Sequence, residues 1–187
     1  MITRPWSAMP ASLSRARRNE MHPLVRLAKR TVEAFVRKGE VIQPRRLSVE
    51  MKEKAGVFVS IHKLGELRGC IGTFEPQHDN VAEEIVANAI SSASRDPRFL
   101  PVTKAELKHL EYSIDVLTEP ELVKSQKELD PKKYGVIVEA GWRKGLLLPD
   151  LEEVNTVKEQ IDICRLKADI DPDEPVKLYR FEVKRYK

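Results

Sequence analysis

One cysteine lies between two glycines, in the six-residue segment 67–72 (LRGCIG). Gly69 and Gly72 would let a substrate approach the thiol of Cys70, and the guanidinium of Arg68 would favour its thiolate form. These residues therefore predict a nucleophilic or redox site. The structural alternative is that Cys70 is a small buried residue and that the glycines let a helix or a strand pack closely.

A second group of polar residues follows in segment 96–99 (DPRF). An arginine between core-directed positions needs a carboxylate partner or an exposed cleft, so Arg68 would form an ion pair or bind an anion. The carboxylates considered as its partners are Glu75, Asp96 and Asp115. Arg98 would add to either role, since a guanidinium pairs well with a carboxylate or a phosphate. We therefore take Arg68, Cys70, Asp96 and Arg98 as the candidate site.

Two further residues have competing interpretations. Trp142 lies beside Arg143 and Lys144 in a glycine-bounded turn, where it would either contact a partner or fold back onto the sheet. Cys164 has the helical spacing of a core position, so we expect it to be structural.

The glycines do not predict a nucleotide-binding loop. Gly65, Gly69 and Gly72 match neither GxGxxG nor a Walker pattern. The helix predicted after them starts with Glu83 and Glu84, which would repel an anion there. We expect these two carboxylates at a solvated helix start and not as an acid–base pair.

The histidines and cysteines encode no metal site by their spacing. The four histidines form no HExxH or HxH group, and the two cysteines form no CxxC pair. A metal site would need ligands that the fold brings together, and the sequence names no cofactor.

Hydrophobic periodicity predicts the elements that position these residues. A helix begins near Leu24, after Pro23, and ends at Gly39. The elements expected next are a hairpin over 57–62 and 67–74, a helix over 81–93 capped by Asp79 and Asn80, and a strand over 110–116. The same order is then repeated by a hairpin over 135–148, a helix that starts with the capping box of Thr156 and Glu159, and a strand over 179–183.

The turn of the first hairpin sets the predicted register. If His62 faces Leu67, then Val59 pairs with Cys70, because each step along one strand is matched by a step along the other. Cys70 would then point toward the core, with His62 on the opposite face. No cysteine–histidine pair follows from this register.

The repeated order of elements indicates an α+β fold of two lobes, each with mainly antiparallel sheet and flanking helices. We expect residues 20–187 to form a single domain of two lobes, divided near 120–133. Residues 1–19 are rich in Ser, Arg, Pro and Ala and are expected to be a flexible basic leader.

The excess positive charge belongs to that leader. The net charge is +4, and the leader's positive charges are Arg4, Arg15, Arg17 and Arg18. The rest of the chain is balanced, which argues against a nucleic-acid-binding face. No apolar run approaches the roughly 20 residues needed to cross a bilayer. Because the leader has no signal-peptide core and only two cysteines occur, we expect a cytoplasmic protein without membrane contact.

Four segments together resemble the AMMECR domain family. They are LRGCIG at 67–72 followed by Thr73 and Phe74, DPRF at 96–99, GLLLP at 145–149 and LYRFEV at 178–183. The chain is similar in particular to family members from AmmeMemoRadiSam systems, and this resemblance implies Memo-like and radical SAM proteins as partners. One departure is Asp169, where the family pattern has glycine, the usual residue of a left-handed helix end.

Three functions are compatible with these observations. The first is a substrate-binding or thiol-containing enzyme component that acts with those partners. The second is a non-catalytic protein-interaction module in which the motif is a folding determinant. The third is RNA binding by an antiparallel sheet, although only 6% of the residues are aromatic. The basic residues near the last strand are Lys177, Arg180, Lys184 and Arg185. Whether the protein is an enzyme is left open.

Overall fold

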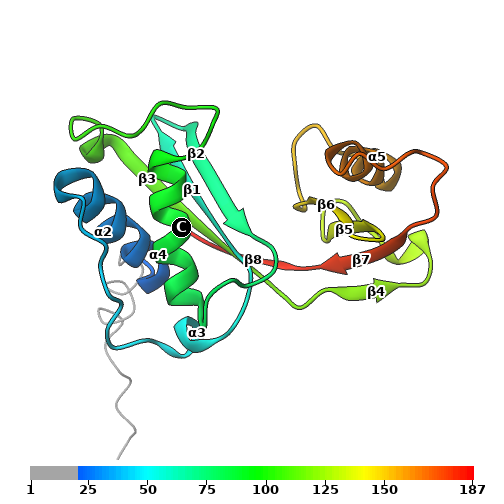
Figure 1. Cartoon of the computed structure of the whole chain (residues 1–187), viewed down its shortest axis with the longest axis horizontal. Helices are drawn as coiled ribbons and strands as arrows, with labels where there is room; N and C mark the ends of the chain where they lie inside the picture. Colours follow the sequence, from blue (N-terminus) through cyan, green and yellow to red (C-terminus); the bar gives the residue numbers. More distant parts are fainter. Residues whose placement is uncertain (1–20) are drawn as a thin grey trace, which may run out of the picture.

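The computed structural model describes residues 21–187, which form two lobes side by side (Figure 1). Each lobe contains a four-stranded antiparallel sheet with flanking helical elements. The predicted fold class, α+β with two lobes of antiparallel sheet, is therefore confirmed. The leader predicted over 1–19 lies outside the described residues.

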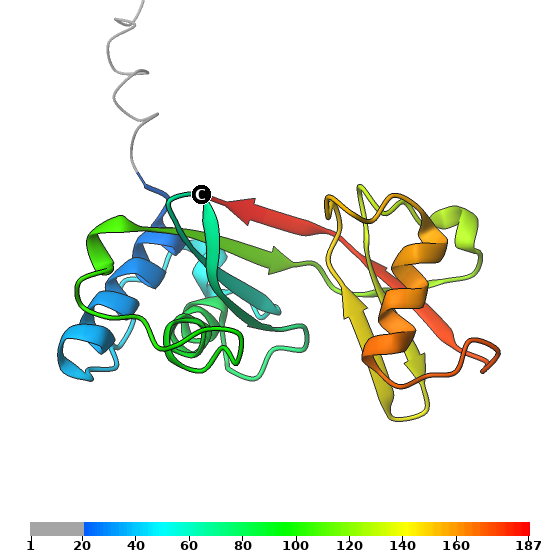
Figure 2. The ribbon, with the colours of Figure 1, turned by 90° about the horizontal axis from the view of Figure 1, so that it is seen from above.

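The first lobe contains the candidate site. Its sheet has the strand order β2-β1-β3-β8. The strands are β1 (Val57–Lys63), β2 (Glu66–Thr73), β3 (Leu110–Leu117) and β8 (Val183–Tyr186), and the helices are α2 (Pro23–Lys38), α3 (Val49–Lys52), α4 (Val81–Ser94) and the 3-10 turn η2 (Leu107–His109). Helices α2 and α4 lie side by side on one face of the sheet, as seen from above in Figure 2.

Alternation along β1 separates the two faces of this sheet. Val57, Val59 and Ile61 are fully buried and form the core beneath α4. Phe58 and Ser60 point to the other side, which we call the open face because no helix within residues 21–187 packs on it. The burial of every second residue is what a strand with one covered face requires.

Local signals explain where the helices of this lobe begin and end. Helix α2 has Pro23 at its first position and stops at Gly39, whose φ of 72° is the left-handed conformation that glycine adopts without steric cost. Helix α4 begins after Asn80, whose side-chain oxygen accepts a hydrogen bond from the amide of Glu83 at 3.0 Å. The predicted positions of both helices are confirmed.

The second lobe repeats the arrangement with a different strand order, β4-β7-β5-β6. Its elements are β4 (Glu121–Val123), the 3-10 turn η3 (Gln126–Glu128), β5 (Gly135–Ala140), β6 (Arg143–Leu147), α5 (Val157–Lys167) and β7 (Lys177–Phe181). Thr156 and Glu159 form the predicted capping box of α5. Helix α5 packs so closely on β6 that a Cβ at Gly145 would overlap the carbonyl of Cys164.

The predicted last strand is in fact two strands that belong to different sheets. Strand β7 pairs with β4 and β5 in the second lobe, and β8 pairs with β3 in the first. The chain crosses between the lobes at Glu182, whose carbonyl accepts a hydrogen bond from the amide of Thr118 at 3.0 Å. Leu117, Ile137 and Phe181 form a small buried cluster at this crossing, so the lobes share apolar contacts.

None of the helices described within residues 21–187 is long and apolar enough to cross a bilayer.

Candidate functional site

A β-bulge in the first hairpin changes the predicted register. His62 does pair with Leu67, but the register shifts between Ile61 and His62, so Ile61 pairs with Gly69 and Ser60 pairs with Cys70. A shift of one residue moves every later side chain to the other face. The prediction that Cys70 points toward the core was therefore wrong, and its half-buried side chain lies on the open face.

The thiol of Cys70 has a hydrogen-bond donor beside it. The hydroxyl of Ser60 donates to Sγ of Cys70, with 3.2 Å between the two atoms. Sulfur is a weak hydrogen-bond acceptor, so this contact orients the thiol on the open face without hiding it in the core. His62 is two residues from Ser60 along β1, so the corrected register also removes the argument that placed it on the opposite face from Cys70.

Segment 96–99 holds the main chain at Cys70. Oδ2 of Asp96 accepts a hydrogen bond from the amide of Cys70 at 2.8 Å, and Arg98 donates from Nη2 to the carbonyl of Cys70 at 3.2 Å. Because β2 is an edge strand of its sheet, these contacts pair peptide groups that no neighbouring strand reaches. The two predicted motifs, LRGCIG and DPRF, are thus directly bound to each other.

Asp96 is the buried centre of this connection. Its side chain is 2% exposed and accepts hydrogen bonds from Nε and Nη2 of Arg98 at 3.0 and 2.8 Å. The hydrogen bonds from Arg98, with those from the amides of Cys70 and Arg98, outweigh the cost of burial and hold the pKa of Asp96 well below its usual range. Asp96 is therefore a charged anchor for the strand that carries the thiol.

Arg68 has a different partner from those predicted. It donates from Nε and Nη2 to the two carboxylate oxygens of Glu106, at 2.9 and 3.2 Å, and not to Glu75, Asp96 or Asp115. Lys63 also contacts Glu106, at 3.1 Å. The bidentate bonds from Arg68 hold the pKa of Glu106 well below its usual range, despite partial burial.

Phe99 lies close to both arginines of the candidate site. The guanidinium carbon of Arg68 is 5.9 Å from the centre of the Phe99 ring, and that of Arg98 is 5.5 Å from it. Both distances allow cation–π attraction. The guanidinium of Arg68 is therefore bound to Glu106 and lies near the ring of Phe99, which connects β2 to two later segments of the chain.

Gly69 and Gly72 contact different neighbours. A Cβ at Gly69 would overlap the main-chain carbonyl of Ser92 in α4, so this glycine lets the helix approach the sheet. A Cβ at Gly72 would overlap the ring of Phe58 on the open face. Close packing accounts for both glycines, as the structural alternative proposed.

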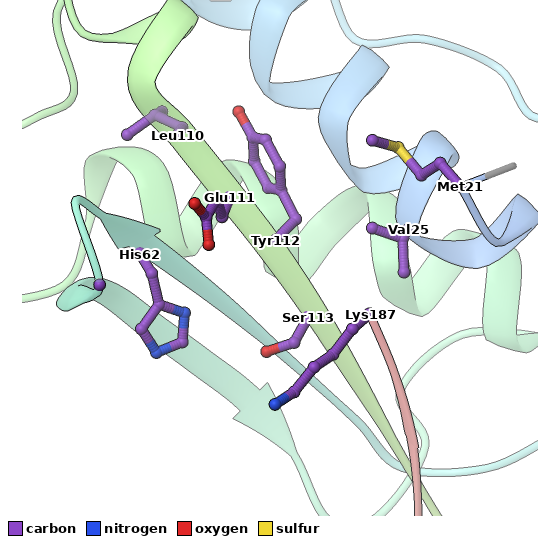
Figure 3. Close-up of a pocket in the computed structure, with 9 residues that line it drawn as sticks. Met21, Val25, His62, Leu110, Glu111, Tyr112, Ser113 and Lys187 are labelled. Atoms are coloured by element: carbon purple, nitrogen blue, oxygen red, sulfur yellow. The ribbon is translucent and has the colours of Figure 1, made fainter. Parts of the chain in front are cut away.

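A cavity of about 460 Å³ lies beside the exposed edge of β3. Figure 3 shows His62, Glu111, Ser113 and Lys187 on one side of this strand and Tyr112 on the other, with Met21 and Val25 of the α2 region facing Tyr112. β8 pairs with β3 only from Ile114 to Leu117, so the first half of β3 lacks a neighbour on this edge within the described chain.

Ser60 connects the thiol to this cavity. Ser60 pairs with Cys70 on one side and with Ser113, which lines the cavity, on the other. Side chains of directly paired residues are about 5 Å apart at their Cβ atoms, so the row from Cys70 to Ser113 spans about 10 Å. The thiol and the cavity therefore belong to one continuous surface on the open face, which includes His62.

Two arginines near the thiol are already paired with carboxylates. Arg98 binds Asp96, and Arg185 donates to both oxygens of Asp115 at 2.7 and 2.8 Å. The pKa of each guanidinium is raised chiefly by its carboxylate, and the charge of an ionised Cys70 adds to this in both cases. The site thus has positive groups near the sulfur, and neighbouring carboxylates partly neutralise their charge.

The remaining predicted residues lie away from Cys70. Trp142 is 89% exposed, so it does not fold back onto the sheet, and it lines an open hollow of about 700 Å³ between the lobes, with Phe74 and Lys144. Lys144 forms an ion pair with Glu75 across this hollow at 2.7 Å. Cys164 is fully buried, as predicted, and burial raises the pKa of its thiol to about 12.

Glu84 was predicted at a solvated helix start, and this was wrong. Its side chain is fully buried and accepts hydrogen bonds from the hydroxyl of Thr73 at 2.8 Å and the amide of His78 at 2.7 Å. Burial raises the pKa of Glu84, but these hydrogen bonds, with those of Gln77, more than offset it, so the net shift is downward. Glu84 connects the end of β2 to α4.

The described part of the chain contains no group of three or more His, Cys, Asp or Glu side chains arranged to hold a metal ion.

Comparison with known proteins adds the family relationship. The model of the AMMECR1 family matches residues 25–186. A protein from Thermotoga maritima is 53% identical over 170 residues, which cover 89% of this chain and 98% of that protein. A protein from Clostridium acetobutylicum is 50% identical over 175 residues, which cover 92% of this chain but 37% of that protein.

A solved structure has the same fold. The crystal structure of the uncharacterized protein PH0010 from Pyrococcus horikoshii matches 87% of this chain and 88% of its own, with a TM-score of 0.79 and 35% sequence identity.

Proposed function

The chain belongs to the AMMECR1 family, and we propose that it acts there as a substrate-binding, thiol-dependent enzyme component whose reactive group is Cys70. The observation that carries this proposal is the hydrogen bond from Ser60 to the thiol, on a face that no described helix covers. A cysteine with a purely structural role would be expected in the core, as Cys164 is.

The surroundings of Cys70 support a nucleophilic role. Asp96 and Arg98 hold both peptide groups of Cys70, so the main chain that carries the thiol is fixed before a substrate binds. A substrate in the cavity beside Ser113 would present an electrophilic carbon toward the sulfur. In the proposed step, Sγ adds to a carbonyl carbon of the substrate, the electron pair of the C=O π bond moves to the carbonyl oxygen, and the thiol proton passes by way of His62, on the same face, to that oxygen.

The volume and lining of the cavity indicate the size and polarity of such a substrate. About 460 Å³ is within the range of about 300–1,000 Å³ typical of small-molecule sites. Its open-face lining supplies an imidazole, a carboxylate, a hydroxyl and an ammonium group from His62, Glu111, Ser113 and Lys187. We therefore propose a small polar substrate with both hydrogen-bond donors and acceptors.

We propose that this component works with other proteins. Memo-like and radical SAM proteins are the partners that its resemblance to AmmeMemoRadiSam members implies. The relative from Clostridium acetobutylicum supports joint action in general terms, because the region similar to this chain is only 37% of a longer protein. We propose no nucleic-acid partner, since Arg180 and Arg185 near the last strands are paired with Glu121 and Asp115.

The thiol hypothesis is tested by alkylation of the native protein. Iodoacetamide should modify Cys70 rapidly in a Cys164→Ser variant, faster than it modifies a cysteine in an unstructured peptide. The matched control is Cys70→Ser, which leaves only Cys164 and should react only after unfolding. If the native protein with Cys70 alone is as inert as the one with Cys164 alone, the proposal is wrong.

A protein-interaction module is the second candidate, and Trp142 is the observation that favours it. A tryptophan with 89% of its surface exposed is unusual on a soluble domain, and tryptophan is common at the centres of protein interfaces. The two candidates predict different effects of Trp142→Ala. If the protein is an interaction module, this change abolishes binding to the protein partner, while the alkylation rate of Cys70 stays the same.

A further inference from the structure

A second cavity, of about 290 Å³, lies between α2 and segment 42–46, on the helix-covered side of the first lobe. Four arginines line it, which are Arg26, Arg30, Arg45 and Arg46. Leu27 and Met51, both less than 9% exposed, supply part of its apolar lining. None of the described residues that line this cavity is acidic, so we call it the arginine cavity.

The arrangement of these arginines concentrates positive charge. Arg26 and Arg30 are four residues apart in α2 and therefore lie on the same helix face, where like charges repel. Arg45 and Arg46 approach the same cavity from the segment after the helix. The side chains of Arg30, Arg45 and Arg46 make no hydrogen bond or ion pair with any residue of the described chain.

The main chain at Arg46 is also unusual. Its φ is 58°, in the left-handed region that a residue with a Cβ adopts only at a conformational cost. Glycine is the residue that a simple turn would favour there. An arginine at such a position, beside three other arginines and without a carboxylate, indicates that the guanidinium has a role that the fold alone does not explain.

We propose that the arginine cavity binds a di- or triphosphate group. A guanidinium forms paired hydrogen bonds with phosphate oxygens, and several negative charges on one small ligand would offset the repulsion among the arginines. Gln43, which also lines the cavity, adds an amide donor. The volume is close to the lower end of the usual range for ligand sites, so it admits the phosphates and little else.

This site is separate from the thiol site proposed above. Cys70 is on the open face of the first sheet, whereas α2 lies against the opposite face. The arginine cavity would thus hold an effector or a second substrate without contact with Cys70. Its existence does not depend on the thiol chemistry.

The test is calorimetric titration of the full chain with tripolyphosphate and, separately, with ATP. We expect both to bind, and similar affinities would show that the phosphates are the recognised group, whereas tighter binding of ATP would show that the nucleoside also contributes. Sulfate at the same concentration is the control for a single anion. The affinity should fall as salt is added, because the attraction is between charges.

Three variants assign the binding to the cavity. Arg30→Gln should weaken tripolyphosphate binding about tenfold or more, since it removes a charged hydrogen-bond donor. Arg46→Gly should weaken binding similarly without lowering the melting temperature, because glycine accepts the left-handed conformation. Arg37→Gln removes the same charge from α2 at a residue that does not line the cavity, and it should leave the affinity unchanged.

The proposal has clear failing outcomes. If neither phosphate compound binds more tightly than sulfate, the cavity is not a phosphate site. If Arg37→Gln weakens binding as much as Arg30→Gln does, the attraction is general surface charge. If Arg46→Gly keeps full affinity, the guanidinium at position 46 has no part in binding and the argument from its backbone is wrong.

Discussion

Ser60 donates a hydrogen bond to the thiol of Cys70 from the neighbouring strand, with 3.2 Å between Oγ and Sγ. We expect Ser60→Ala to slow the alkylation of Cys70 by about 2- to 10-fold, the factor that corresponds to one hydrogen bond of about 0.5–1.5 kcal/mol. The rate is measured with iodoacetamide in a Cys164→Ser background, so that only Cys70 reacts.

Ser113→Ala is the matched control for this prediction. Ser113 pairs with the other side of Ser60 and is not the donor to Sγ, so its removal should leave the alkylation rate unchanged. Equal slowing in both variants would mean that the change acts through the strand and not through the hydrogen bond.

The face on which Cys70 lies could not be predicted from the sequence. The pairing of His62 with Leu67 was predicted correctly, but the bulge beside Ile61 adds one residue to β2. The segment has no local signal that separates a regular pair from a bulged one, since Gly69 fits either. Tertiary packing decides the register. Only with this register does Gly69 face α4, where a side chain would overlap Ser92.

Long-range partners were the other unpredictable feature. Caps such as Asn80 and Thr156, and the stop at Gly39, act within one or two turns and are visible in the sequence. The partner of Arg68 is 38 residues away, at Glu106, and burial of a carboxylate such as Glu84 depends on donors that the fold brings to it. Sequence patterns therefore predicted the helices and strands. The partners and the burial of the site residues could be seen only in the packed structure.

Gly69→Ala tests whether close packing of α4 is the reason for this glycine. The added Cβ would overlap the main-chain carbonyl of Ser92, so the helix would have to move away from the sheet. We expect the free energy of unfolding to fall by about 3 kcal/mol, as for other overpacked sites. Urea denaturation measures this change.

Cys70→Ala serves as the comparison for that change. Residue 70 already carries a Cβ, and its side chain points to the open face. We therefore expect Cys70→Ala to lower the free energy of unfolding by less than about 1.5 kcal/mol. A Gly69→Ala protein as stable as Cys70→Ala would contradict the packing argument.

Three paired carboxylates determine the pH dependence of stability. The native-state pKa of each lies below its ordinary value, which is 3.8 for Asp96 and 4.5 for Glu84 and Glu106. In acid the unfolded chain therefore binds more protons than the folded one. The stabilisation is present in full above about pH 4.5 and is lost as the pH falls below the unfolded values.

Urea midpoints from neutral pH down to about pH 3 check this prediction. We expect little change above pH 4.5 and a steep loss below it. The Glu106→Gln variant should be less stable at neutral pH, because Arg68 loses its charged partner. The urea midpoint of this variant should also change less between neutral pH and about pH 3. A wild-type midpoint that stays constant to about pH 3 would show that these ion pairs add nothing to stability.

Asp169 has the left-handed conformation that its place at the end of α5 predicted, with a φ of 53°. Asp169→Gly should raise the free energy of unfolding by about 0.5 kcal/mol, the steric cost removed less the backbone entropy that glycine adds to the unfolded chain. The hydrogen bond that Arg143 donates to residue 169 reaches the main-chain carbonyl, so glycine keeps it. Asp171→Gly is the control, since Asp171 does not have a positive φ and glycine there should lower stability. If thermal unfolding shows the two variants to be equally destabilised, the strain at Asp169 is too small to matter.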